Sequence, residues 1–191
     1  MDPFLLVFIQ AFLLLFVALD TIGNIPVFFI LTKKMPLKKR RKNVKIALLL
    51  ASGLLVLFLL FGEYVLRFFA ISIGDFRIAG GIILAIIGLK LVLNLRLLEN
   101  RAEKYQNAII PMATPLVTGP AAITAVIVNT ATYGLLISAL AVIANLLIVW
   151  VILTRTDFFF RLFGRQGADV LSKIFGIILV AIGIGFIRGG V

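Results

Sequence analysis

The sequence contains no cysteine and no histidine among its 191 residues. Disulfide bonds, thiolate or imidazole metal ligands, and catalysis by cysteine or histidine are therefore excluded. The chain also lacks the pattern Gly-x-x-x-x-Gly-Lys-Ser/Thr, so ATP would not be hydrolysed by this chain. Asp20 is the only carboxylate deep in an apolar segment, so no catalytic dyad is expected. We expect a protein that is not an enzyme and that holds no cofactor or metal.

Charged residues are scarce as well. They make up 14% of the chain, whereas 62% is hydrophobic and the mean hydropathy is +1.19. Soluble domains are about half apolar, so this composition predicts an all-α integral membrane protein. The net charge of +11 does not indicate a nucleic-acid partner, because eight of the nineteen basic residues stand in one block, Lys33 to Lys45, between apolar segments. That block predicts a cytoplasmic loop beside anionic lipid, and the lipid bilayer is an expected partner.

Apolar segments along the chain predict six membrane-spanning helices. They cover about residues 4–32, 44–66, 75–95, two spans within the charge-free stretch 105–154, and 170–187. The two spans of the charge-free stretch are predicted to meet at Thr130-Ala131-Thr132-Tyr133-Gly134. Three loops on one side carry fifteen Lys or Arg, and the opposite loops carry almost none. This asymmetry predicts a multi-pass protein of the cell membrane with both termini outside.

An internal repeat suggests how the spans are organised. The eight residues Gly81–Gly88 recur as Gly176–Gly183, with six identities at an offset of 95 residues. We interpret the chain as a single transmembrane domain, 1–191, formed by repeat one (1–95), a charged linker (96–104) and repeat two (105–191). Each repeat holds three spans, an odd number, so the second enters the membrane from the opposite side and the topology is inverted. Glycine pairs such as Gly80-Gly81 would also suit a contact between the subunits of a homo-oligomer.

Two clusters of helix-breaking and small polar residues stand at corresponding places in the two repeats. The first consists of Asp20, Thr21, Gly23, Asn24 and Pro26. The second consists of Thr114, Pro115, Thr118, Gly119 and Pro120. We predict that spans 1 and 4 are broken helices, with Asn24 and either Thr118 or Gly119 as caps and a proline in the first turn of each new helix. The ten residues of the two clusters form our candidate substrate-binding or ion-binding site.

Broken helices in a membrane expose backbone groups that protein, water or a ligand must satisfy. Amides at the start of a half-helix attract anions, whereas carbonyls and a carboxylate at the preceding end attract cations. A small zwitterion presents both charges. A charge near the bilayer centre costs ~2.5 to 3.5 kcal/mol, so a proton or Na⁺ is a plausible coupling ion for Asp20. The simpler alternative is that Asp20 braces the break and binds nothing.

The two clusters, together with Phe76–Leu84 in the third span and Pro111–Ile123 in the second repeat, resemble the MarC family of small integral membrane proteins. The resemblance extends over nearly the whole chain. It implies six spans in a plasma membrane and, for some members, uptake of small neutral amino acids such as glycine or alanine. Thr21 stands where the family usually has a proline after the aspartate, which leaves the detailed geometry of the first break open.

The leading hypothesis is a secondary transporter of a small neutral solute that works by alternating access. Asp20 would hold an ammonium group or a coupling cation, amides near Asn24 and Gly119 would hold a carboxylate, and Gly23 would keep the pocket narrow. Asp20 is expected to face Thr114–Pro120 across a cavity. Two alternatives stay open: a non-transporting membrane scaffold or partner-binding subunit, and an efflux protein for another small compound.

Overall fold

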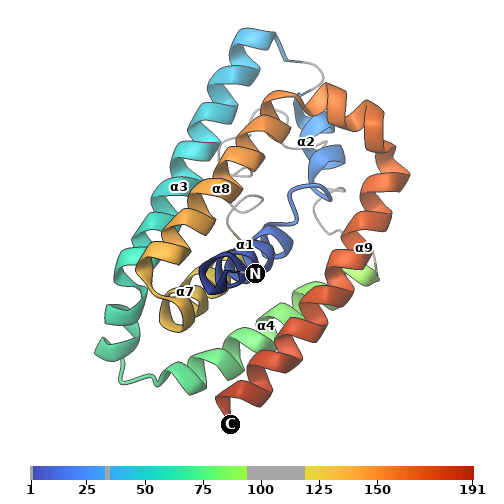
Figure 1. Ribbon diagram of the computed structural model, residues 1–191. Helices are drawn as coiled ribbons and strands as arrows, with labels where there is room; N and C mark the ends of the chain where they lie inside the picture. The colour runs from blue at the N-terminus through green and yellow to red at the C-terminus, as the bar shows by residue number, and fades with distance from the viewer. Residues whose placement is uncertain (1, 33–34, 94–118) are drawn as a thin grey trace.

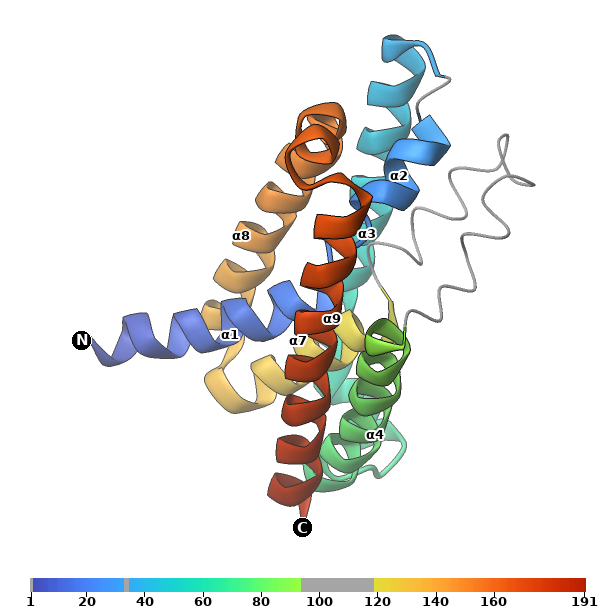
Figure 2. The same ribbon diagram turned by 90° about the vertical axis from the view of Figure 1, so that its right-hand side faces the viewer.

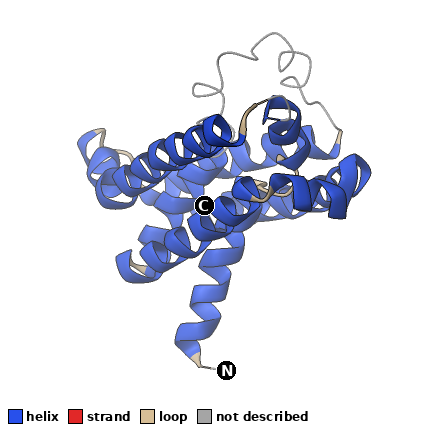
Figure 3. Ribbon diagram, turned by 90° about the horizontal axis from the view of Figure 1, so that it is seen from above, coloured by secondary structure: helices blue, strands red, loops and turns tan. Residues whose placement is uncertain are grey.

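The computed structural model describes residues 2–32, 35–93 and 119–191, and every regular element in these ranges is an α-helix (Figures 1 and 3). The helices are α1 (Pro3–Leu19), α2 (Ile25–Thr32), α3 (Leu37–Phe68), α4 (Ile73–Val92), α7 (Pro120–Tyr133), α8 (Leu135–Thr154) and α9 (Thr156–Gly190). The predicted all-helical class is therefore confirmed for the described residues.

Three of the described helices, α3, α8 and α9, are long and apolar enough to cross a bilayer. α1 is apolar but has 17 residues, and α7 has 14. α4 has 20 residues but carries Asp75, Arg77 and Lys90. An α-helix rises 1.5 Å per residue, so α1 and α7 are too short to cross a ~30 Å hydrocarbon core on their own.

Glycine and capping residues set several helix boundaries. α7 ends at Tyr133 and α8 begins at Leu135, so the turn lies within the predicted stretch 130–134, at Gly134 with φ 82°. Ser72 caps α4. Its hydroxyl oxygen accepts a hydrogen bond from the Asp75 N–H at 3.0 Å, and the Asp75 carboxylate accepts one from the Ser72 N–H. α9 starts well before the predicted last span, and Gly164, with φ 61°, divides it into two helical parts.

The long helices form two neighbouring pairs, α3 with α8 and α4 with α9, while α1 crosses their direction (Figures 1 and 2). α1 and α7 contact each other, and their buried residues share one core with residues of α3, α8 and α9. Large apolar side chains such as Leu49, Phe68 and Leu136 are exposed on the outside. A surface of this kind is suited to lipid, because hydrocarbon chains replace the protein contacts that it lacks.

Glycines bring α4 and α9 into backbone contact. A methyl group on Gly183 would lie 2.5 Å from the Gly81 carbonyl oxygen, and one on Gly176 would lie 2.6 Å from the Gly88 oxygen. Gly190 meets the Gly74 oxygen in the same way. The two helices therefore run antiparallel with a glycine contact at every seventh residue, and a larger side chain at these positions would force the backbones apart.

Candidate functional site

The first cluster forms the connection between α1 and α2. α1 ends at Leu19, and Asp20 takes the left-handed conformation with φ 41° and ψ 44°. Its N–H donates to the Val17 carbonyl at 3.1 Å, and its own carbonyl accepts the Asn24 N–H at 3.1 Å. Aspartate tolerates this conformation better than most residues because its short polar side chain bonds locally. The chain is non-helical from Asp20 to Asn24 and helical again at Ile25.

Asn24 connects the two helices across this turn. Its carbonyl accepts the Phe28 N–H at 3.0 Å, as the carbonyl of a capping residue does at the start of a helix. Its side-chain Nδ2 reaches back to the Leu19 carbonyl at 3.4 Å. The last carbonyls of a helix have no partner within the helix, so this bond serves the end of α1.

The Asp20 carboxylate is fixed by a residue that sequence reasoning did not single out. The Ser172 hydroxyl, on α9, donates to Asp20 Oδ1 at 3.2 Å and to Oδ2 at 3.0 Å. Asp20 is 7% exposed and Ser172 is 1% exposed. Ser172 lies 152 positions further along the chain, so no local pattern links the two residues. The only available signal was a hydroxyl group inside the predicted sixth span.

Gly23 makes this contact sterically feasible. A methyl group on Gly23 would collide with the Ser172 hydroxyl and would lie 2.6 Å from Asp20 Oδ1. Thr21, beside Asp20, is also buried at 5% exposure. The turn, the carboxylate and α9 therefore form one close-packed unit, in which glycine is required at position 23.

The second cluster falls only partly within the described residues. Thr114, Pro115 and Thr118 lie outside them, so the expected approach of Asp20 to Thr114–Pro120 is not covered by the described chain. Gly119 is the N-cap of α7 and Pro120 its first residue. The Gly119 carbonyl accepts the Ala122 N–H at 3.0 Å. Pro26 lies in the first turn of α2, and its side chain is not described.

Two buried amides, also missed in the sequence, hold α1 in place. Asn129 of α7 donates to the Ala11 carbonyl at 2.9 Å, and Asn145 of α8 donates to the Phe12 carbonyl at 3.2 Å. Both are 1% exposed, and their Oδ1 atoms have no partner in the described part of the chain. A polar side chain in a charge-free apolar stretch was the available signal.

A cavity of about 200 Å³ lies beside Asn129. Its lining comes from α1, α4, α7 and α9 and consists of Leu14, Arg77, Val128, Asn129, Thr132, Tyr133, Gly185, Phe186 and Gly189. Arg77 donates to the Thr132 hydroxyl at 2.6 Å and so joins α4 to α7. The cavity therefore presents an amide, hydroxyl groups and a guanidinium between helices of both sequence halves.

Helices of this length and apolarity define an integral membrane protein. The chain belongs to the MarC family of integral membrane proteins, which matches residues 5–191, so the resemblance inferred from the sequence is confirmed. It is 35% identical over 195 residues to a UPF0056 membrane protein of Methanocaldococcus jannaschii, covering 96% of this chain and 95% of that protein.

Two further relatives are similar over the same extent. A UPF0056 membrane protein of Archaeoglobus fulgidus is 34% identical over 198 residues, covering 96% of this chain and 91% of the relative. One of Aquifex aeolicus is 29% identical over 202 residues, covering 100% and 94%. No solved structure matches the chain with significance.

Proposed function

We propose that this protein is a secondary transporter of a small neutral solute, with glycine and alanine as the leading candidates, and that it works by alternating access between two inverted repeats. The observation that carries the proposal is the Asp20 carboxylate, buried at the end of α1 and bonded to Ser172 of α9. A buried carboxylate at a helix interruption is suited to bind a cation or an ammonium group.

The glycine contacts between α4 and α9 support the inverted repeats. A shift of 95 residues carries Gly81 to Gly176 and Gly88 to Gly183. If each glycine is replaced by its counterpart in the other repeat, the contact of Gly81 with Gly183 becomes the contact of Gly176 with Gly88, and the structure contains both contacts. A two-fold rotation that exchanges α4 and α9 produces this result. The rotation axis is perpendicular to the two antiparallel helices. For spanning helices, that axis lies in the membrane plane.

Other elements follow the same exchange. α2 contacts α9, and α7, which starts 95 residues after α2, contacts α4. Ala70, just before α4, has φ 54°, and Gly164, 94 residues later, has φ 61°. In the proposed architecture, six spans are divided between repeats 1–95 and 105–191, and α1 with α2 makes one interrupted span. The chain would then alternate access by movement of one repeat against the other.

In this proposal Asp20 binds the ammonium group of the solute or a coupling H⁺ or Na⁺. The backbone amides that follow Asn24 and Gly119 bind the carboxylate, since both residues stand at helix starts. Gly23 limits the size of the solute, because even a methyl group there collides with Ser172. The bound cation would replace the Ser172 hydroxyl as the partner of the Asp20 carboxylate. Ion binding would then break a contact between the turn and α9 and so affect the position of α9.

The ends of the helices support the proposed orientation in a plasma membrane. The start of α3, which lies within the basic block Lys33 to Lys45, is beside the start of α9, and Arg40 forms an ion pair with Asp157 there. The C-terminus lies at the other end of α9 (Figure 1). Basic residues favour the cytoplasmic side, so the C-terminus is proposed to face outward, and the proposed six spans put the N-terminus on the same side.

Uptake by the purified protein in liposomes tests the proposal. Native protein should accumulate glycine and alanine but not leucine under an imposed H⁺ or Na⁺ gradient, and Asp20→Asn should abolish accumulation. Glu63→Gln is the matched control, because it makes the same chemical change on an intermediately exposed side chain of α3 and should transport normally. If neither influx nor efflux responds to Asp20→Asn in a folded protein, the proposal fails and a scaffold role takes its place.

A further inference from the structure

We infer that the end of the molecule at which α3 and α9 begin holds one anionic phospholipid, with its phosphate in a basic pocket and an acyl chain in the adjoining groove between α3 and α8. The basic pocket has a volume of about 420 Å³. It is lined by Arg40, Arg41, Val44, Lys45, Trp150, Leu153, Thr154, Arg155 and Asp157. Four cationic side chains face one carboxylate in this lining, so the pocket carries a net positive charge suited to an anion.

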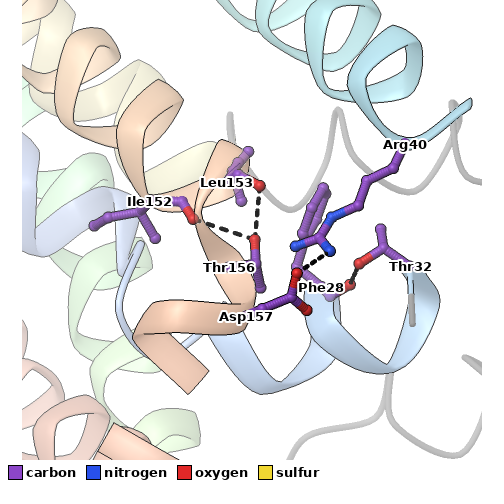
Figure 4. Close-up of polar contacts among 7 residues, drawn as sticks. All are labelled: Phe28, Thr32, Arg40, Ile152, Leu153, Thr156 and Asp157. Atoms are coloured by element: carbon purple, nitrogen blue, oxygen red, sulfur yellow. Dashed lines mark hydrogen bonds and ion pairs between the residues drawn. The ribbon is translucent and has the colours of Figure 1, made fainter. Parts of the chain in front are cut away.

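Arg40 is the buried member of the basic pocket. It is 7% exposed, and its Nη1 atom forms an ion pair with Asp157 Oδ2 at 2.5 Å (Figure 4). Its Nε and Nη2 atoms are buried and have no partner among the described residues. Those two atoms are closed off from solvent, so Arg40 contributes its positive charge to the basic pocket. The exposed Arg41, Lys45 and Arg155 are the donors that a phosphate can reach.

The surroundings of the basic pocket favour a lipid over a free anion. An apolar groove of about 360 Å³ adjoins it, lined by Lys45, Leu48, Leu49, Ser52, Ile143, Leu146, Leu147 and Trp150. Lys45 and Trp150 line both spaces, so the basic pocket and the groove lie side by side. Tryptophan at a membrane interface and a basic pocket between helices on the cytoplasmic side are both features of lipid headgroup sites. A phosphate with an attached acyl chain fills both spaces at once.

Lipid binding to the delipidated full-length protein, followed by native mass spectrometry, tests this inference. Phosphatidylglycerol should bind far more tightly than phosphatidylcholine with the same acyl chains. The triple variant Arg41→Gln, Lys45→Gln, Arg155→Gln should lose phosphatidylglycerol affinity by on the order of 100-fold, because each basic residue contributes ~1 kcal/mol toward an anionic lipid. These three residues are exposed, so their replacement should leave the fold intact.

The matched control removes the same charge from α3 outside the basic pocket: Lys38→Gln, Lys39→Gln, Lys42→Gln, all at exposed positions. It should keep nearly native affinity for phosphatidylglycerol. Equal losses in the two triple variants would mean that charge acts without a site, and would overturn the inference. Equal binding of the two lipids by native protein would overturn it as well.

A third arm separates the lipid from free phosphate. Ile143→Trp should fill the groove and weaken phosphatidylglycerol binding, whereas Leu136→Trp, on the same helix but outside the groove, should not. Both positions are more than half exposed, so the larger side chain has space. If inorganic phosphate displaces phosphatidylglycerol completely, or if the groove variant binds it normally, the site takes a free anion and the lipid assignment is wrong.

Discussion

Asp20 and Arg40 are the two charged residues that are buried in the described part of the chain, each 7% exposed, and they are held in different ways. Asp20 accepts hydrogen bonds from a neutral hydroxyl and sits in a left-handed turn closed by Gly23. Arg40 extends from the first turn of α3 and contacts a carboxylate that is 52% exposed. The contact described for Asp20 is thus a hydroxyl within a tight turn, whereas the contact described for Arg40 is an opposite charge.

This difference determines what each residue is suited for. In the proposed function, a cation would replace the Ser172 hydroxyl at Asp20 without leaving an opposite charge behind. Removal of its partner leaves the buried Arg40 charge uncompensated, so Arg40 suits a permanent contact or a tightly held anion.

The largest expected effect on stability comes from removing the charge of Asp157, the more exposed partner in the ion pair with Arg40. Asp157→Asn should lower the free energy of unfolding in lipid-free detergent by about 3 kcal/mol, because it leaves the Arg40 charge buried without its counter-ion. Thermal unfolding followed by tryptophan fluorescence measures the change. The control is the double variant Arg40→Met, Asp157→Leu, which removes both charges and should stay within about 1 kcal/mol of native. An unchanged stability for Asp157→Asn would show that charge does not fix Arg40.

A smaller loss is expected when the shape of the Asp20 turn is changed. Gly23→Ala should destabilise the protein by about 2 kcal/mol, the cost typical of overpacking at a close contact. Ser172→Ala in the same chain removes one colliding atom and should recover part of the loss, since the added methyl group meets the Ser172 hydroxyl first. The same thermal assay on single and double variants measures this coupling. Strict additivity of the two changes would contradict a direct contact.

The smallest expected effect belongs to the hydrogen bond from Ser172 to the Asp20 carboxylate. Ser172→Ala alone should cost about 1.5 kcal/mol, the lower value for a hydrogen bond to a charged group. A loss as large as that of Asp157→Asn would show that Asp20 depends on this hydroxyl as strongly as Arg40 depends on its counter-ion, and would reverse the order predicted here. Ser138→Ala is a useful control, because that buried hydroxyl bonds the Gly134 carbonyl within its own helix turn.

Several features of the site were predictable from local sequence. Asp20, Gly23 and Asn24 mark the end of α1 because they are the residue types that leave a helix readily, and Gly119 with Pro120 marks the start of α7 for the same reason. Ser172, Asn129 and Asn145 could not be assigned to the site in this way. Each bonds a residue more than 100 positions away, and an apolar sequence carries no signal for such a pairing.

The internal repeat also has one part that local sequence predicted and one part that it did not. Six shared residues predicted that Gly81–Gly88 and Gly176–Gly183 are related, but not that they pack against each other. The basic block likewise indicated a membrane interface without indicating that Arg40 turns inward to Asp157 while Arg41 and Lys45 line a pocket. Helical phase decides which of these neighbouring cations is buried, and packing of α9 supplies the partner.

The sequence by itself determined that the chain is helical, that it belongs in a membrane and that it is a member of the MarC family, because these follow from composition, from periodic apolar segments and from short motifs. Only the tertiary structure decided which hydroxyl meets Asp20, which carboxylate meets Arg40 and which glycines touch. These contacts join distant segments, and their energies depend on close packing and on burial, which exist only once the helices have assembled.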